Sequence, residues 1–283
     1  MPKVAGLLYY PVKGCGVVST TAATVTSAGL THDRSFMVVS EEGVFMTQRR
    51  HPRLALIAPA VSADEQTLTL RADERHGAVR VPVDTTGPRR DVDLFGRPYR
   101  GIDQGAAAAR WLSDFLGVRS RLVRVPPEHG RVTDGRTPGT SGYADSCALH
   151  IVSASSLDHL NGRLLARGAH PLAMNRFRPN IVVDGWAEPH TEDRALRIRV
   201  GDAELGYAKL AIRCAVTLVD QETAAKAGPE PMRTLALYRR AATGGVAFGS
   251  KYAVLRPGKV SLGDAVEVTR WGVSELHGPT GRS

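Results

Sequence analysis

Residues 212–220 of this chain read Ile-Arg-Cys-Ala-Val-Thr-Leu-Val-Asp, which places Cys214 directly behind Arg213. The apolar and β-branched residues that follow predict a buried strand with Cys214 at its entrance and Val216, Leu218 and Val219 in the core. A fixed positive charge stabilises a thiolate, the form that acts as a nucleophile or binds a soft metal. A lone cysteine can equally fill a core as a small apolar side chain. The stretch alone leaves these roles open.

Cysteine usage and hydropathy limit the class of protein. Cys15, Cys147 and Cys214 are odd in number, far apart and form no Cys-x-x-Cys pair. This pattern argues against a disulfide framework or a structural zinc site. No stretch approaches the roughly 18 to 20 apolar residues that cross a bilayer, and the N-terminus has no cleavage signature. We expect a cytoplasmic protein without a membrane partner.

The net charge of +9 raises the question of nucleic acid. The arginines are scattered over the whole length without a basic tail, and aromatic residues are only 6% of the chain. A base-stacking platform needs aromatic and basic residues interleaved, so we expect no nucleic-acid partner. Arginine also binds phosphorylated anions through its planar fork. The composition therefore fits a site for a phosphorylated ligand, or a bias without functional meaning.

Short strand patterns separated by turns dominate the chain. They predict a β-rich α+β fold with few helices and barrel-like sheets, rather than alternating βαβ units. A polar stretch rich in Gly, Pro and Thr follows residue 125 and predicts a domain boundary there. Helices are expected at 105–116, with Gly117 as the cap, from Ser155 onwards, and at 232–240. Strands are expected at 4–10, 17–25, 36–39, 44–46, 54–61, 67–70, 79–81, 121–125, 148–152, 181–183, 196–200, 203–210, 252–255, 259–262 and 265–269.

Polar clusters stand at the ends of several predicted strands, where loops converge on sites. They include Lys13 in a Pro/Gly turn, Arg34 before a strand, the pair Asp145-Ser146, and the stretch 175–180. Each alone reads as a solvated loop or a local cap. Together with Arg213-Cys214 they offer one soft ligand and several anion-binding groups. Such a set suits a metal held by a phosphorylated organic cofactor.

The motifs occur in an ordered series over nearly the whole chain. They are Tyr10-Pro11-Val12-Lys13, Gly29-Leu30 with Asp33-Arg34, Thr47-Gln48-Arg49 with Pro52-Arg53-Leu54, Ser155 to Asn161, Phe177 to Val183, Glu192-Asp193, Arg213-Cys214 with Val219-Asp220, Thr234-Leu235 with Tyr238-Arg239, Phe248-Gly249, and Gly263-Asp264. In this order they resemble the MOSC family, molybdenum cofactor-binding proteins that include the mitochondrial amidoxime-reducing component and its bacterial relatives.

The resemblance implies an organisation and a site. It implies a smaller N-terminal β-barrel-like domain at 1–125, packed against a MOSC β-barrel domain at 126–274, with a tail at 275–283. Cys214 would be the catalytic molybdenum ligand. The pterin and its phosphate would be held at the junction of the domains, by Lys13, Arg34, Asp145, Ser146, Arg178, Asn180 and Arg213.

Three positions depart from the family pattern. Gly14 stands where relatives often have serine, and Cys147 stands where a small hydroxyl residue is common. Lys251 lies near a position where some relatives have tyrosine, with Tyr252 next to it, so the aromatic contact is left unassigned. None of these departures touches Cys214.

The resemblance implies an oxidoreductase that uses the molybdenum cofactor to reduce N-hydroxylated small molecules such as amidoximes. Electrons would come from a separate protein, such as a ferredoxin or a flavin reductase. Two alternatives remain at this point. One is a carrier of molybdenum cofactor or sulfur that uses Cys214. The other is a non-catalytic basic binding module in which Cys214 belongs to the core.

Overall fold

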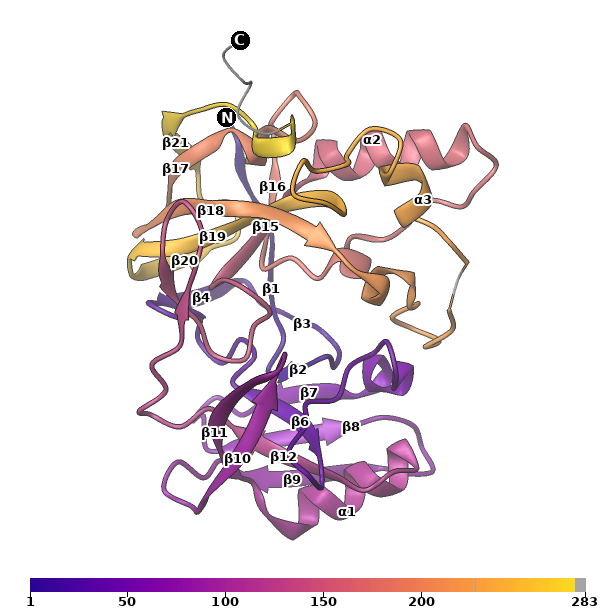
Figure 1. Cartoon of the computed structure of the whole chain (residues 1–283). Helices are drawn as coiled ribbons and strands as arrows, with labels where there is room; N and C mark the ends of the chain where they lie inside the picture. The colour runs from indigo at the N-terminus through magenta and orange to yellow at the C-terminus, as the bar shows by residue number, and fades with distance from the viewer. Residues whose placement is uncertain (227, 278–283) are drawn as a thin grey trace.

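The largest sheet of the computed structural model has eight strands and lies in the upper half of Figure 1. The model describes residues 1–226 and 228–277. All neighbouring strands of this sheet are antiparallel except β15 and β16, whose parallel pairing requires the crossover through helix α2. The strand order is β21 (Val266–Trp271), β17 (Ala195–Val200), β18 (Ala203–Arg213), β19 (Val246–Arg256), β15 (Leu149–Ser153), β16 (Ile181–Asp184), β1 (Lys3–Tyr9), β3 (Val18–Ser19).

Two smaller sheets and a helix form the lower half of Figure 1. Their core contains Phe36, Leu68, Leu112 and Leu122, all at most 1% exposed. Helix α1 (Gly105–Leu116) packs on β12 and β9, and it ends at Gly117 in the left-handed conformation, as predicted. The sheets are β10 (Arg89–Leu94), β11 (Arg97–Asp103), β12 (Ser120–Arg124), β6 (Phe36–Ser40), β2 (Val12–Lys13), and β7 (Ala58–Val61), β8 (Thr67–Arg71), β9 (Ala78–Pro82).

The first thirty residues contribute to both halves. β1 and β3 belong to the eight-stranded sheet, whereas β2 pairs with β6 below it. Residues 258–261 (β20, Gly258–Ser261) pair with β4 (Ala22–Thr26), which continues to β5 (Gly29–Leu30). The polar stretch after residue 125 holds the short pair β13 (Val132–Thr133) and β14 (Gly139–Thr140). The chain therefore passes between the halves next to Lys13.

The remaining helices are short. They are α2 (Ala154–Leu165), α3 (Met232–Leu235), and the 3₁₀ turns η1 (Pro52–Leu56), η2 (Met174–Phe177), η3 (Thr191–Asp193), η4 (Ala215–Leu218) and η5 (Glu275–His277). No helix in the described residues is long and apolar enough to cross a membrane. Of the predicted tail at 275–283, residues 278–283 lie outside the described residues. The predicted β-rich fold with few helices is confirmed.

The strand expected at 54–61 begins only at Ala58, because residues 52–56 form the 3₁₀ turn η1. Two further local predictions are wrong. β18 ends at Arg213, and Cys214 precedes the turn η4 instead of heading a buried strand. Thr217 ends the extended conformation, because its backbone N–H and its hydroxyl both donate to the carbonyl of Cys214. Only Val219 of the predicted core residues is fully buried; Val216 and Leu218 are half-buried.

The second of these is the length of the helix expected at 232–240, which is only four residues long as α3. The backbone N–H of Arg239 still donates to the carbonyl of Leu235 at 2.7 Å, as in a helix, but the chain then turns to bring Arg239 beside β19. Its carbonyl accepts a hydrogen bond from the N–H of Ala247, 2.9 Å away.

Candidate functional site

Cys214 directly follows the last residue of β18, an inner strand of the eight-stranded sheet. Its thiol is exposed, whereas Cys15 and Cys147 are buried. Arg213 is the last residue of β18, paired with Val246 of β19, and its Nη2 donates to the carbonyl of Phe177 at 2.9 Å. The strand pairing and this bond fix the backbone from which the thiol projects. Cys214 is thus available to a ligand at a fixed position.

Arg34 and Arg178 come from the two halves of the molecule and meet on one aromatic ring. The guanidinium carbons lie 4.2 Å and 4.1 Å from the ring centroid of Tyr10. Both arginines have left-handed backbone conformations, with φ of 49° and 56°. This conformation costs an L-residue about 1–2 kcal/mol, and it concentrates at functional sites. The fold therefore holds two like charges together at a cost in conformational free energy.

Asn180 holds Arg34 in place. Its side-chain oxygen accepts from Arg34 Nη1 at 3.2 Å and from the backbone N–H of His150 at 3.0 Å. Arg34 also pairs with Asp33 at 2.6 Å and donates to the carbonyl of Arg178. Asn180 is only 1% exposed. The structure places it behind the arginines, so its geometry suits positioning of Arg34 better than direct contact with a ligand.

Lys13 of β2 forms an ion pair with Asp145, which lies in the loop before β15. Burial lowers the pKa of Lys13, and the Asp145 carboxylate opposes this effect. Desolvation acts to raise the pKa of Asp145, but Lys13, with Lys251 and Arg34, outweighs it and holds that pKa well below its ordinary value. The predicted residue Ser146 is half-buried and lies beside Cys147. The predicted groups of this loop thus come together with Lys13.

Lys251 is a site residue that the sequence predictions did not assign. It lies on β19, opposite His150 of β15 and Lys209 of β18. Burial, and then the charge of Arg213, lower the pKa of Lys251 to about 7, with a smaller opposing effect of Asp145. Alternation along β19 could have found it, because its neighbour Tyr252 faces the core and Lys251 must face the other way.

The site has more positive than negative charge. We call Lys13, Arg34, Arg178, Arg213 and Lys251 the cation cradle; their carboxylate partners within the described residues are Asp33 and Asp145. Two buried donors, Nη2 of Arg178 and Nε of Arg213, find no partner in that part of the chain. Buried donors are normally satisfied, so these two are oriented for an acceptor that the protein does not supply.

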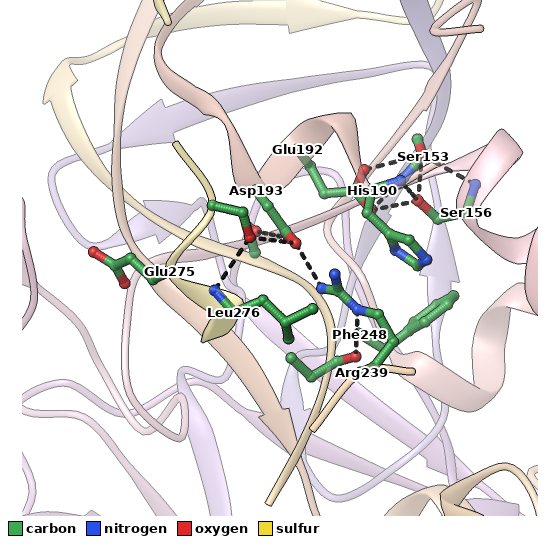
Figure 2. A network of polar contacts seen from close by, with 12 residues as sticks. Ser153, Ser156, His190, Glu192, Asp193, Arg239, Phe248, Glu275 and Leu276 are labelled. Carbon is green, nitrogen blue, oxygen red and sulfur yellow. Dashed lines mark hydrogen bonds and ion pairs between the residues drawn. The ribbon is translucent and has the colours of Figure 1, made fainter. Parts of the chain in front are cut away.

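A second charged group lies on the other face of β19 (Figure 2). We call Glu192, Asp193 and Arg239 the buried network. Asp193 pairs with Arg239 at 2.6 Å. Its other oxygen accepts from the hydroxyl of Ser250 on β19 at 2.9 Å. Glu192 accepts from the hydroxyl of Ser156 in α2 at 2.8 Å. Arg239 also donates to the carbonyl of Ala247, next to the residue that pairs with Arg213. The buried network therefore supports the strand end that carries Cys214.

Family models match two parts of the chain: the MOSC N-terminal beta barrel domain at residues 1–119 and the MOSC domain at residues 138–267. Mitochondrial amidoxime-reducing component 1 of Mus musculus is 34% identical, with 93% of this chain and 81% of the relative aligned. The Homo sapiens protein of the same name is 32% identical, with 93% and 82% aligned. The molybdenum cofactor sulfurase of Danio rerio is 30% identical over 87% of this chain but only 31% of the relative.

MOSC domains bind the molybdenum cofactor, and the residues of this site fit that group. A pterin phosphate binds positive charge and free hydrogen-bond donors. The cation cradle offers both, because two of its buried nitrogens have no hydrogen-bond partner in the described residues. Molybdenum bound by two cofactor sulfurs needs a further soft ligand, which the exposed thiol of Cys214 offers. Within residues 1–226 and 228–277 no three His, Cys, Asp or Glu side chains gather as a metal site of their own.

Proposed function

The chain belongs to the MOSC family that includes the mitochondrial amidoxime-reducing components, and from this premise we propose that it is a molybdenum cofactor-dependent reductase of N-hydroxylated compounds. The observation that carries the proposal is the exposed thiol of Cys214 at the end of β18, beside a cradle whose buried donors lack protein acceptors. A structural cysteine would need neither the exposure nor the surrounding excess of positive charge.

The residues divide into two tasks. Cys214 is the metal ligand, and Lys13, Arg34, Arg178 and Arg213 hold the pterin and its phosphate. When bound, the cofactor supplies the two-electron redox centre at which an N–OH oxygen is removed. The overall reaction takes up two electrons and two protons, converts N–OH to N–H and releases water.

Asp145 and Ser146 lie in the loop before β15, beside Lys13. Burial lowers the pKa of Lys13 and the Asp145 carboxylate opposes this effect, so the ion pair favours the charged form of the lysine beside the cofactor phosphate. Asn180 acts through Arg34, whose Nη1 it holds at 3.2 Å. Lys251 adds a further amine to the cradle, and we assign no proton transfer to any of these groups.

The electrons come from a separate redox protein, such as a ferredoxin or a flavin reductase. The formal charge of +9 favours an acidic donor, because complementary charges accelerate association. Turnover with such a donor should slow as salt increases. We keep the cytoplasmic location as a prediction of the sequence.

The test is molybdenum content and turnover of the protein expressed in a host that makes the cofactor. We expect about one molybdenum per chain, and reduction of benzamidoxime to benzamidine with a reduced viologen as donor. Cys214→Ala should lose both, while Cys147→Ala, a matched change at a buried cysteine, should keep both. A fully loaded protein that reduces no N-hydroxylated compound would overturn the proposal.

A second function is favoured by the match to molybdenum cofactor sulfurases and by the exposure of the same thiol. In that case the protein carries molybdenum cofactor or sulfur, and Cys214 holds a persulfide. Mass spectrometry of the intact protein separates the two functions: a persulfide adds about 32 Da to a chain that contains no molybdenum. The same spectrum of Cys214→Ala should lack the added mass.

A further inference from the structure

A groove of about 410 Å³ lies beside the site, between the two halves of the molecule. Its floor is apolar: Ala55, Ile57 and Phe115 are at most 4% exposed. A volume of this size is in the range of small-molecule pockets, which are apolar with a few polar groups. The remaining lining residues are Gly16, Leu56, Ala58, Ala72, Asp73, Gln221 and Glu222.

Gln221 lines the groove and also contacts the cation cradle. Its Oε1 accepts from Arg178 Nη1 at 3.2 Å, and its amide exchanges two hydrogen bonds with that of Gln48, at 3.1 Å and 3.0 Å. Gln48 is 1% exposed and also donates to the carbonyl of Gly14, next to Lys13. The groove therefore opens directly beside the residues proposed to hold the cofactor.

Two carboxylates border the groove from opposite halves. Asp73 follows β8, and Glu222 follows η4. Hydrogen bonds from the ring and the backbone N–H of His76 reach one oxygen of Asp73 and lower its pKa, which leaves the second oxygen for another donor. Glu222 is exposed and forms no ion pair in the part of the chain that the structure describes. The guanidinium of Arg53 stacks on the ring of Phe115, 4.4 Å from its centroid, so this apolar groove carries two carboxylates against one guanidinium.

We propose that this groove binds the organic part of the substrate and favours compounds whose reduced product is a cation, meaning aryl amidoximes and N-hydroxyguanidines, over hydroxamic acids. The inference rests on the proposed function. Reduction of an amidoxime takes up two electrons and two protons and releases water, and the amidine formed then takes up a third proton. The product is a flat cation with two parallel N–H donors, which suits a carboxylate as a guanidinium does. A hydroxamic acid gives a neutral amide, which gains nothing from Asp73 or Glu222.

Binding of the product tests the groove without turnover. Isothermal titration of the cofactor-loaded protein with benzamidine should give saturable binding, which Glu222→Gln and Asp73→Asn should each weaken on the order of tenfold. Benzamide, the neutral isostere, should bind all forms equally. Glu188→Gln is the matched control, since Glu188 is an exposed carboxylate that pairs with Arg194 outside the groove. Unchanged benzamidine affinity in both groove variants would overturn the proposal.

A steric variant tests the same groove through the reaction. Ala58→Phe should fill it and raise the KM for benzamidoxime on the order of tenfold at unchanged molybdenum content. Ala60→Phe is the control, because Ala60 is exposed on the same face of β7 but does not line the groove. Reduction of benzamidoxime with the same KM in both would reject the groove and keep the proposed function. Benzamidine binding lost in Ala58→Phe, in a protein that reduces nothing, would reject the function and keep the groove.

Discussion

Ser250 and Lys251 are neighbours on β19, yet their side chains enter two very different charged environments. Ser250 faces the buried network, where its hydroxyl donates to Asp193, and Tyr252 points to the same side and donates to the carbonyl of Glu192. Lys251 faces the cation cradle, where the charges around it are mostly like its own. One strand thus separates a satisfied cluster from an unsatisfied one.

The two clusters differ in what they need to be stable. In the buried network each carboxylate oxygen has a donor: Arg239, Ser250, Ser153 or Ser156. The cradle instead leaves Nη2 of Arg178 and Nε of Arg213 without partners in the described residues. It also holds Arg34 and Arg178 in the unfavourable left-handed backbone conformation. A cluster complete in itself supports the fold, whereas an incomplete one is preorganised for a ligand.

The largest effect should come from breaking the satisfied cluster. Arg239→Met keeps much of the side-chain volume but leaves Asp193 as a buried carboxylate without a counter-charge. Removing one partner of a buried ion pair costs about 3–5 kcal/mol, and we expect the free energy of unfolding in urea to fall by that amount. Arg233→Met, at an exposed position of α3, should change it by less than about 0.5 kcal/mol. A loss for Arg239→Met no larger than this control would mean that the buried network is not structural.

The same kind of change in the cradle should act on the ligand instead. Arg178→Asn removes a cation whose neighbours include Arg34, and asparagine tolerates the left-handed backbone at this position. We expect the unfolding free energy of the cofactor-free protein to change by less than about 1 kcal/mol, because lost repulsion offsets lost contacts. Retention of the cofactor should fall about 10- to 100-fold, as for residues that support a metal site.

Molybdenum and pterin fluorescence after gel filtration measure that retention. Arg194→Asn, at an exposed arginine outside the cradle, is the control and should retain the cofactor fully. If Arg178→Asn unfolds as readily as Arg239→Met, the difference between the two clusters disappears and the cradle is structural as well.

Sequence patterns predicted the parts of this molecule that depend on local periodicity. The helix at 105–116 and its cap at Gly117 follow from a single apolar stripe and a glycine. The β-rich α+β class follows from the many short strand patterns. The role of Arg213-Cys214 stays a prediction, and the strand was placed after this pair although β18 comes before it. The hydroxyl of Thr217 donates to the carbonyl of Cys214 and so favours a turn over a strand there. A hydropathy pattern does not contain this hydrogen bond.

Non-local pairing explains what the sequence did not reveal. Lys251 belongs to the cradle only because β19 lies between β15 and β18, and strand order cannot be read from one strand. Likewise Asp73 and Glu222, 149 positions apart in the chain, border one groove because the two halves meet there. The motifs around Lys13, Arg34, Arg178 and Arg213 did predict that these residues converge, and the shared ring of Tyr10 is the contact through which two of them meet.

The smallest expected effect is also the most direct measure of the cradle's excess charge. Lys251 has a pKa lowered to about 7 by burial and by Arg213, whereas a lysine in the unfolded chain titrates near about 10.4. Between these values the unfolded chain binds the proton more tightly than the folded one. The stability that Lys251 contributes is therefore fully present above about pH 10.4 and is lost as pH falls towards 7.

Lys251→Met should remove this dependence and stabilise the cofactor-free protein at pH 7. The full pKa difference corresponds to roughly 4–5 kcal/mol, but Lys251 is only half-buried, and solvent screening reduces the expected gain to on the order of 1 kcal/mol. Urea unfolding at several values from pH 6.5 to 9.5 checks it: the difference between variant and wild type should shrink as pH rises. Lys259→Met, at an exposed position of β20, should show no such trend. A Lys251→Met protein less stable than wild type at pH 7 would show that the amine is paired in solution. The cradle would then be closer to the buried network than the contrast across β19 implies, since its charge would already be satisfied by the protein itself.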